Sequence, residues 1–309
     1  MKYEDWLNEW FENYIAPTAK SRTYSVYTIL TEKHIVPKLG GYDLDELSLP
    51  VLQHYVTELL QCGNLKTGNG LAANSVNAII NIIQNSMEMA YNLGYIIKNV
   101  SEKIKRPKTE EKAITCFSVA EQKKIEQAVL SDSREKVIGI LICLYTGLRI
   151  GEVLALTWED IDFKSGLLTV SKSCHDGLNK EGKYVRICDT PKTSSSIRVI
   201  PLPKQILPIL KHAKKKNRSE FVVSSGEKVL FVRSYQRTFE LLLNKLKIPH
   251  KGFHALRHTF ATRALECGMD VKTLSEILGH RSPTVTLNRY AHSMLEHKRE
   301  MMNKVGKLL

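Results

Sequence analysis

Several signatures of common protein classes are missing from this 309-residue sequence. Its six cysteines include no C-x-x-C pair, so the sequence predicts free thiols, mostly in the core, rather than a disulfide framework or a zinc site. It also has no Walker loop and no cluster of metal ligands. We therefore expect no cofactor.

Long apolar segments are missing as well. The longest apolar run, at residues 137–145, is too short to cross a bilayer and predicts a buried helix. The first residues are acidic where a secretory signal would place basic residues before an apolar run. These features predict a cytoplasmic protein with no membrane partner.

Positive charge is abundant and unevenly distributed. The formal net charge is +13 at pH 7. Residues 1–110 carry 11 Lys and Arg against 12 Asp and Glu, whereas residues 111–309 carry 34 against 20. A basic region of this kind favours a polyanionic partner such as nucleic acid, although charge that serves only solubility would give the same composition.

The first hundred residues read as a separate helical domain. Apolar spacing predicts four helices, at residues 3–15, 21–34, 50–61 and 74–93. In the first of them Trp6, Trp10 and Tyr14 recur every fourth residue, a stripe more typical of a core than of a ligand platform. We assign residues 1–100 to this domain.

A basic, proline-containing stretch follows, and residues 101–115 are predicted to be a linker. This linker either only joins the two domains or lies along the phosphate backbone of a nucleic acid. The second domain, residues 116–309, opens with a capping box in which Ser118 and Glu121 satisfy each other's backbone N–H groups.

The second domain is predicted to be mainly α-helical with one small antiparallel β-sheet. A turn at Gly147 precedes an amphipathic helix that starts at Arg149 and ends near Trp158. Strands are expected at residues 167–171, 184–189 and 197–202, with Lys192 in the turn between the last two. From residue 239 onward the pattern is helical.

Two segments carry candidate chemistry. His254 and Arg257 are three residues apart, so on a helix they share one face and can direct two donors at one anion. This pattern alone is weak evidence for an anion-binding site. Downstream, His280 precedes a helix for which Ser282 and Pro283 suit the first positions, and Tyr290 is carried on that helix.

Taken together, these motifs resemble the tyrosine recombinases, or phage integrase family, over nearly the whole chain. The resemblance implies a helical, SAM-like core-DNA-binding domain followed by a mixed α/β catalytic domain. It also implies six catalytic residues: Arg149 in TGLRIGE, Lys192 in TPKTSSS, His254 and Arg257 in H-x-x-R, His280 in LGH, and the nucleophile Tyr290. Glu152 is expected to support Arg149 through a salt bridge.

The chemistry of DNA cleavage explains these residue types. Attack on a phosphodiester adds negative charge to its oxygens, and the forked guanidinium groups of Arg149 and Arg257 suit that charge. Tyr290 must lose a proton, with His254 as the expected acceptor and His280 as a donor to the phosphate. Lys192 is expected to protonate the leaving 5′-oxygen. The 3′-phosphotyrosyl product keeps the bond energy, so rejoining needs no ATP. With two arginines in place, no metal is expected to be needed either.

The implied function is site-specific recombination that integrates or excises a mobile element. The expected partners are a double-stranded DNA site, a homo-tetramer on synapsed DNA coupled through residues 293–309, and an accessory excision factor. The sequence starts directly at the predicted core-binding helices, without the small arm-binding domain of many integrases, so a Xer-like resolvase and a chain truncated from a longer protein both stay open. Three other functions compete with this one. The first is a non-catalytic regulator, which a helix-turn-helix pattern at 261–279 suggests. The others are a type IB topoisomerase and a two-metal transposase.

Overall fold

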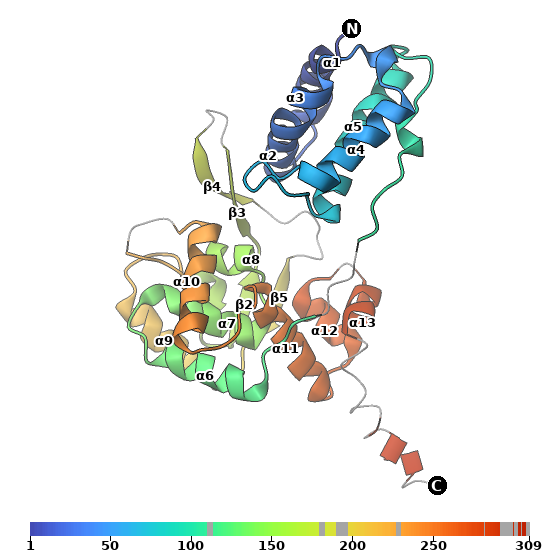
Figure 1. Cartoon of the computed structure of the whole chain (residues 1–309). Coiled ribbons are helices and arrows are strands. Elements are labelled where there is room, and N and C mark those ends of the chain that lie inside the picture. The colour runs from blue at the N-terminus through green and yellow to red at the C-terminus, as the bar shows by residue number, and fades with distance from the viewer. Residues whose placement is uncertain are drawn as a thin grey trace. The chain divides into compact units, whose positions relative to one another are not determined.

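A computed structural model describes residues 1–109, 114–178, 183–189, 197–226, 230–280, 282–290, 299, 302–303 and 305–306. For residues 288–290 only the backbone is described. The chain divides into two compact units, Met1–Lys112 and Ala113–Leu309 (Figure 1). Lys192 and most of residues 293–309 lie outside the described residues.

The first unit is helical throughout. Helix α1 (Tyr3–Trp10) continues through a π-helical turn at Phe11–Ile15. Helix α2 (Ser21–Leu30) continues through a similar turn at Thr31–Ile35 into α3 (Val36–Leu39). Helices α4 (Leu49–Cys62) and α5 (Ala73–Asn92) complete the unit. All four predicted helices are present, and the second extends further than expected.

The aromatic stripe of α1 forms part of the core of this unit. Trp6 and Trp10 are almost fully buried, and Trp6 Nε1 donates to the Ser86 carbonyl oxygen at 3.0 Å. The Tyr3 hydroxyl lies 2.8 Å from Ser86 Oγ. The prediction that these aromatic residues pack in a core is confirmed.

The basic stretch after α5 packs against the first unit as far as Pro107. Ile104 is buried in the core of that unit. Arg106 Nη2 donates to Asn81 Oδ1 at 2.7 Å, and Asn77 Nδ2 donates to the Pro107 carbonyl oxygen at 3.2 Å. These contacts attach the stretch to α5.

The second unit is built around α7 (Ile138–Thr146), whose residues from Ile138 to Leu144 are all buried. This matches the buried helix expected at 137–145. The predicted Ser118 capping box is also present, with Glu121 N donating to Ser118 Oγ at 3.2 Å and Ser118 N donating to Glu121 Oε2 at 2.7 Å. The remaining helices are α6 (Val119–Leu130), α8 (Ile150–Ala155), α9 (Leu207–Lys216), α10 (Val232–Lys245), α11 (His254–Glu266), α12 (Val271–Leu278) and α13 (Pro283–Tyr290).

Two small antiparallel sheets replace the single sheet that was expected. One contains β1 (Ile161–Asp162), β2 (Leu167–Val170) and β5 (Arg198–Pro201) in the order β1-β2-β5. In its register Leu168 faces Ile200. The other sheet is the hairpin of β3 (Ser173–Leu178) and β4 (Tyr184–Asp189). Strand β3 was not predicted, and this hairpin was therefore not predicted either.

The prediction of six free thiols is wrong. Cys174 and Cys188 form a disulfide, with their Cα atoms 4.0 Å apart. They are directly opposite each other in the β3–β4 pair, a placement that brings side chains of neighbouring strands together. The other four cysteines are free, but only Cys143 is buried, whereas Cys62 and Cys267 are exposed. The expectation of mostly buried thiols is therefore also wrong.

Helix α8 is shorter than expected, ending at Ala155 rather than near Trp158. Leu156 turns into extended backbone, and its carbonyl oxygen accepts from Val222 N at 2.9 Å. The chain leaves the helix because it pairs with this distant segment. All residues from Gly151 to Ala155 are buried, so α8 is not amphipathic.

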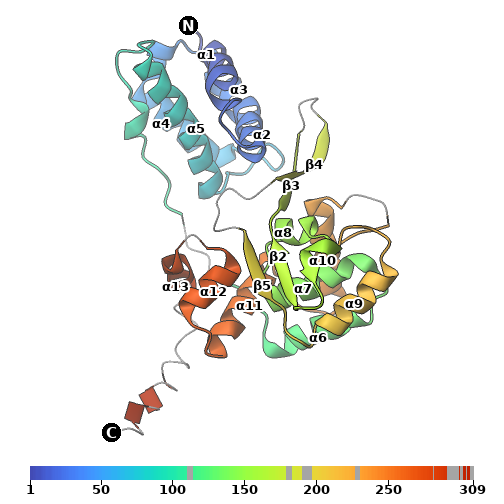
Figure 2. The ribbon, with the colours of Figure 1, turned by 180° about the vertical axis from the view of Figure 1, so that it is seen from behind.

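Helices α11, α12 and α13 lie together beside β5 (Figure 2). Gly268, between α11 and α12, and Gly279, after α12, have φ angles of 87° and 64°. This left-handed conformation strongly favours glycine, and it allows the two sharp turns. None of the helices in the described residues combines the length and the apolar character that a membrane-spanning segment needs.

Candidate active site

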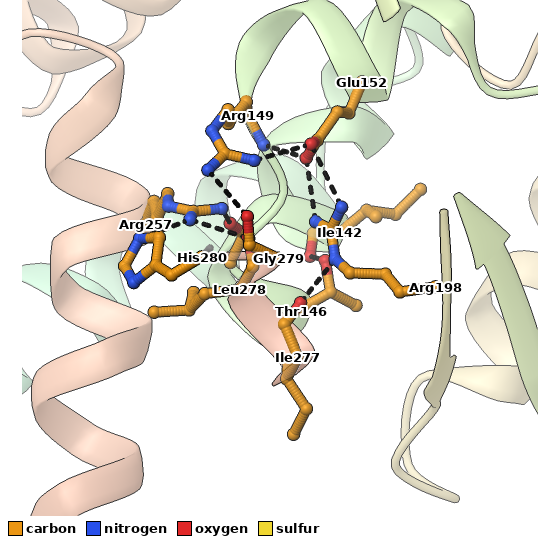
Figure 3. Close-up of polar contacts among 11 residues, drawn as sticks. Ile142, Thr146, Arg149, Glu152, Arg198, Arg257, Ile277, Leu278, Gly279 and His280 are labelled. Atoms are coloured by element: carbon orange, nitrogen blue, oxygen red, sulfur yellow. Dashed lines mark hydrogen bonds and ion pairs between the residues drawn. The ribbon is translucent and has the colours of Figure 1, made fainter. Parts of the chain in front are cut away.

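The C-terminal end of α12 brings three arginines together (Figure 3). The carbonyl oxygens of Ile277, Leu278 and Gly279 accept hydrogen bonds from Arg198 Nε, Arg257 Nη2 and Arg149 Nη2, at 2.6, 2.8 and 3.3 Å respectively. The last carbonyls of a helix have no partner within the helix and lie at the negative end of its dipole. This helix end therefore favours a cluster of cations.

Arg257 is the most deeply buried of the three, at 2% exposure. Its Nη1 donates to the carbonyl oxygen of Gly147, the left-handed residue that ends α7, at 2.9 Å. Its Nη2 donates to the Leu278 carbonyl oxygen at the end of α12. The guanidinium group thus bridges two helix C-termini, and backbone atoms fix its orientation.

Arg257 also contacts His280, which begins the connection to α13. Arg257 Nη2 lies 2.9 Å from His280 Nε2, and His280 Nδ1 lies 2.7 Å from Thr286 Oγ1. A guanidinium group has only donors, so Nε2 accepts and the ring hydrogen is on Nδ1, which donates to Thr286. Thr286 is fully buried on α13. His280 therefore connects Arg257 to the helix that carries Tyr290.

Arg149 is held by Glu152. It is the residue before α8, and its backbone N–H donates to Glu152 Oε2 at 2.8 Å. Its Nη1 forms an ion pair with Glu152 Oε1 at 2.9 Å. The second arginine on this carboxylate is Arg198, whose Nη2 and Nη1 lie 2.9 and 3.1 Å from the two oxygens (Figure 3). Glu152 is thus shared between two guanidinium groups.

The Glu152 carboxylate stays charged despite its burial. Burial by itself would raise the pKa of Glu152, but the hydrogen bonds and charges of Arg198 and Arg149 outweigh that effect and lower the pKa below its ordinary value. Arg198 is the larger of these two influences. The carboxylate is therefore a fixed negative charge beside Arg149.

His254 is the first residue of α11 and is exposed, one turn before Arg257. Its ring centroid lies 4.6 Å from that of His258, with the two rings nearly perpendicular. The shared face expected for His254 and Arg257 follows from their places on α11.

The other two predicted residues are described less completely. Tyr290 is the last residue of α13, and only its backbone is described. The predicted start of this helix is confirmed, because Pro283 is its first residue and Ser282 Oγ accepts from Thr284 N at 3.2 Å. Lys192 lies outside the described residues.

Arg198 is a residue of this site that was not predicted from the sequence. Arg198 and Ile200 are the buried positions of β5, and Val199 and Pro201 are exposed. A charged residue on the buried face of a strand is uncommon unless it is paired, and that was the available signal. Within the described part of the chain, no group of three or more His, Cys, Asp or Glu residues could hold a metal ion.

Comparison with known proteins identifies the family of this chain. The model of the phage integrase family matches residues 109–297, and that of the phage integrase N-terminal SAM-like domain matches residues 2–60. The chain belongs to the phage integrase family. A XerC-like tyrosine recombinase from Caldanaerobacter subterraneus is 30% identical over 98% of this chain and 82% of its own length. The ICEBs1 integrase of Bacillus subtilis is 26% identical over 94% of this chain and 79% of its own length.

Solved structures of integrases share the fold. The Tn1549 transposon integrase in complex with transposon right-end DNA matches with a TM-score of 0.80 and 22% identity, over 99% of this chain and 100% of that chain. A lambda integrase tetramer bound to a Holliday junction matches with a TM-score of 0.70 and 20% identity, over 92% and 79% of the two chains. The predicted fold class, a helical SAM-like domain and a mixed α/β domain, is confirmed. This phage integrase family member is a tyrosine-type site-specific recombinase.

Proposed function

We propose that this recombinase cleaves and rejoins DNA through a covalent bond between Tyr290 and a 3′-phosphate, and that it thereby integrates or excises a mobile element. The observation that carries this proposal is the meeting of Arg149, Arg257 and His280 at the end of α12. These residues come from segments far apart in the sequence. The two arginines supply fixed cations where a phosphodiester would gain charge, and His280 lies beside Arg257.

In this proposal the two arginines grip the scissile phosphate. Arg149 has a side-chain exposure of 38%, so a DNA oxygen would be able to reach this side chain. Arg257 is buried and oriented by backbone carbonyls, so it needs little rearrangement as charge develops. A guanidinium group remains charged at any physiological pH and can contact two phosphate oxygens at once.

Proton transfer is assigned to the remaining residues. His254 would accept the Tyr290 proton, and Lys192 would protonate the leaving 5′-oxygen. His280 would contact a phosphate oxygen through Nε2. Because Nε2 accepts from Arg257 without DNA, that contact requires either a second ring proton or release of the Arg257 bond.

The expected partners follow from the same proposal. The first unit, with residues 1–100 as a core-DNA-binding domain, and the basic second unit would each bind a double-stranded DNA site in the cytoplasm. Four copies would act on synapsed DNA, as proposed from the lambda integrase tetramer bound to a Holliday junction. Residues 293–309 would couple neighbouring copies, and an accessory factor would direct excision.

A Xer-like resolvase is the second candidate. The XerC-like relative at 30% identity favours it, and the ICEBs1 integrase favours the mobile-element function. The two functions share cleavage chemistry but differ in the DNA that is joined. Sequencing the DNA around the gene distinguishes the two functions. A mobile element would show boundaries marked by repeats on either side of the gene.

The central test replaces Tyr290 by phenylalanine. Tyr290→Phe removes only the phenolic oxygen, so we expect normal DNA binding and no covalent protein–DNA complex. The DNA site can be selected from random duplexes with this inactive variant, and the complex detected as an SDS-resistant band on a nicked copy of the selected site. An SDS-resistant band formed by Tyr290→Phe contradicts the proposed nucleophile.

A further inference from the structure

Arg198 is a buried arginine that none of the catalytic motifs contains. It opens β5, and its side chain is 6% exposed. Its Nη1 and Nη2 donate to the two carboxylate oxygens of Glu152, and its Nε donates to the Ile277 carbonyl oxygen at 2.6 Å. It therefore connects three elements of the second unit, β5, α8 and the end of α12 (Figure 3).

The charges around Glu152 suggest what this arrangement does. Arg149 and Glu152 alone would form a neutral pair, and the carboxylate would compete with a DNA phosphate for the Arg149 guanidinium. With Arg198 included, the three groups carry one net positive charge. Arg149 is the exposed member, so it is the one that can offer this charge to an anion.

We infer that Arg198 is a positioning residue for DNA cleavage: it neutralises Glu152, so that Arg149 keeps its positive charge for the scissile phosphate. The same side chain fixes the end of α12, which precedes His280. This inference rests on the proposed function, because it assigns Arg198 a role in the reaction that the two catalytic arginines support.

A purely structural role makes a different prediction. Arg198 is packed closely, since a Cβ atom at Gly279 would lie 3.0 to 3.2 Å from its side chain. If Arg198 only filled space, its loss would slow DNA cleavage by the same factor whether residue 152 carries a charged carboxylate or not. If it neutralises Glu152, removing the carboxylate must compensate for its loss, because a buried charge without its partner is the costly state.

The test compares Arg198→Met, Glu152→Gln and the double variant with the wild type. The measurement is the single-turnover rate of covalent complex formation on a nicked copy of the selected DNA site, at a temperature where circular dichroism shows every variant folded. Arg198→Lys keeps the charge without the forked geometry. Arg263→Met is the matched control, because Arg263 also pairs with a glutamate, Glu266, and donates to a backbone carbonyl, that of Phe117 at 3.0 Å.

We expect Arg198→Met to lower the rate on the order of 100-fold, the effect of losing one well-placed electrostatic group. Adding Glu152→Gln should restore the rate by about tenfold, within the range of coupling between residues in contact. Arg198→Lys should be faster than Arg198→Met, and Arg263→Met should stay close to the wild type.

A double variant as slow as Arg198→Met, or slower, overturns the role assigned to Arg198. So does an unchanged rate for Arg198→Met. These results differ from a failure of the proposed function, in which the wild-type chain itself forms no covalent complex while Tyr290→Phe still binds the DNA. That outcome overturns both proposals, whereas the first two leave the proposed function intact.

Discussion

Arg149 and Arg257 contact the same helix end, but the structure holds them in different ways. Arg149 is partly exposed and is paired with a carboxylate, Glu152. Arg257 is buried, and the carbonyl oxygens of Gly147 and Leu278 accept its hydrogen bonds. A carboxylate can be protonated, neutralised or exchanged for a phosphate, whereas a backbone carbonyl cannot.

The contacts around Arg149 and those around Arg257, called here the Arg149 side and the Arg257 side, are therefore expected to respond to different substitutions. The Arg149 side depends on the charges of Glu152 and Arg198, so substitutions that alter charge should affect it. The Arg257 side depends on where α7 and α12 end, so substitutions that alter the backbone should affect it. Preorganised groups stabilise developing charge without reorganising during the reaction, and Arg257 fits that description more closely.

The largest expected effect tests whether both arginines act on the phosphate and Lys192 on the leaving group. Lys192→Ala should slow cleavage of ordinary DNA by roughly 100 to 10,000-fold, the range of general-acid effects. A bridging 5′-sulfur leaves without a proton, so the same variant should cleave that substrate at nearly the wild-type rate. Single-turnover cleavage of the two substrates measures this difference.

Arg149→Ala and Arg257→Ala are the controls for the sulfur experiment. Both should fail on both substrates, because the charge on the phosphorane is still not stabilised. Equal loss for Lys192→Ala on the two substrates would move Lys192 into the phosphate-binding group. His254 would then be the first candidate for the acid.

The second-largest expected effect distinguishes the role of Arg257 from that of Arg149. An ammonium group cannot reach the Gly147 and Leu278 carbonyls and His280 together, so Arg257→Lys should reduce the cleavage rate by about 100-fold or more. It should also lower the free energy of unfolding, because buried carbonyls lose their donors. Arg149→Lys should leave stability nearly unchanged, since its side chain is 38% exposed. Urea unfolding and single-turnover cleavage measure the two effects, and equal stability losses would remove the distinction.

Much of this arrangement follows from local sequence signals. The helices of the first unit, the Ser118 capping box and the start of α13 were all predicted, because apolar spacing and capping residues act over a few positions. The salt bridge expected between Arg149 and Glu152 is also present, and these two residues are only three apart in the sequence. These features need no knowledge of the tertiary fold.

The missed features depend on pairing between distant segments. The Cys174–Cys188 disulfide and β3 depend on the register of a hairpin. Arg198 meets Glu152 across 46 residues and Ile277 across 79 residues. A single sequence shows that Arg198 is on the buried face of a strand, but not which carboxylate it meets.

The pH dependence of stability should reveal the charge on the Arg149 side. Because the pKa of Glu152 is lowered in the folded chain, its carboxylate stabilises the fold above the ordinary pKa of 4.5 and loses that contribution as the pH falls through the folded value. Glu152→Gln should therefore cost roughly 3 kcal/mol near neutral pH. The difference from wild type should shrink below about pH 4.

Urea unfolding at several pH values measures this difference. A free-energy difference that stays constant down to about pH 3 would mean that Glu152 contributes no charge-dependent stability.

The smallest expected effect concerns the backbone of the Arg257 side, where two glycines provide a matched pair. Gly279 and Gly268 both have left-handed φ angles, so alanine at either position should cost about 1 to 2 kcal/mol of stability. A Cβ atom at Gly279 would meet the Arg198 side chain, whereas at Gly268 it would meet nothing within 4 Å. Gly279→Ala should therefore also slow cleavage several-fold by displacing Arg198 and the carbonyls of α12, and Gly268→Ala should not. Thermal unfolding and single-turnover cleavage of both variants make the comparison. If the two alanine variants slow cleavage equally, the backbone at the end of α12 has no special role in placing the arginines.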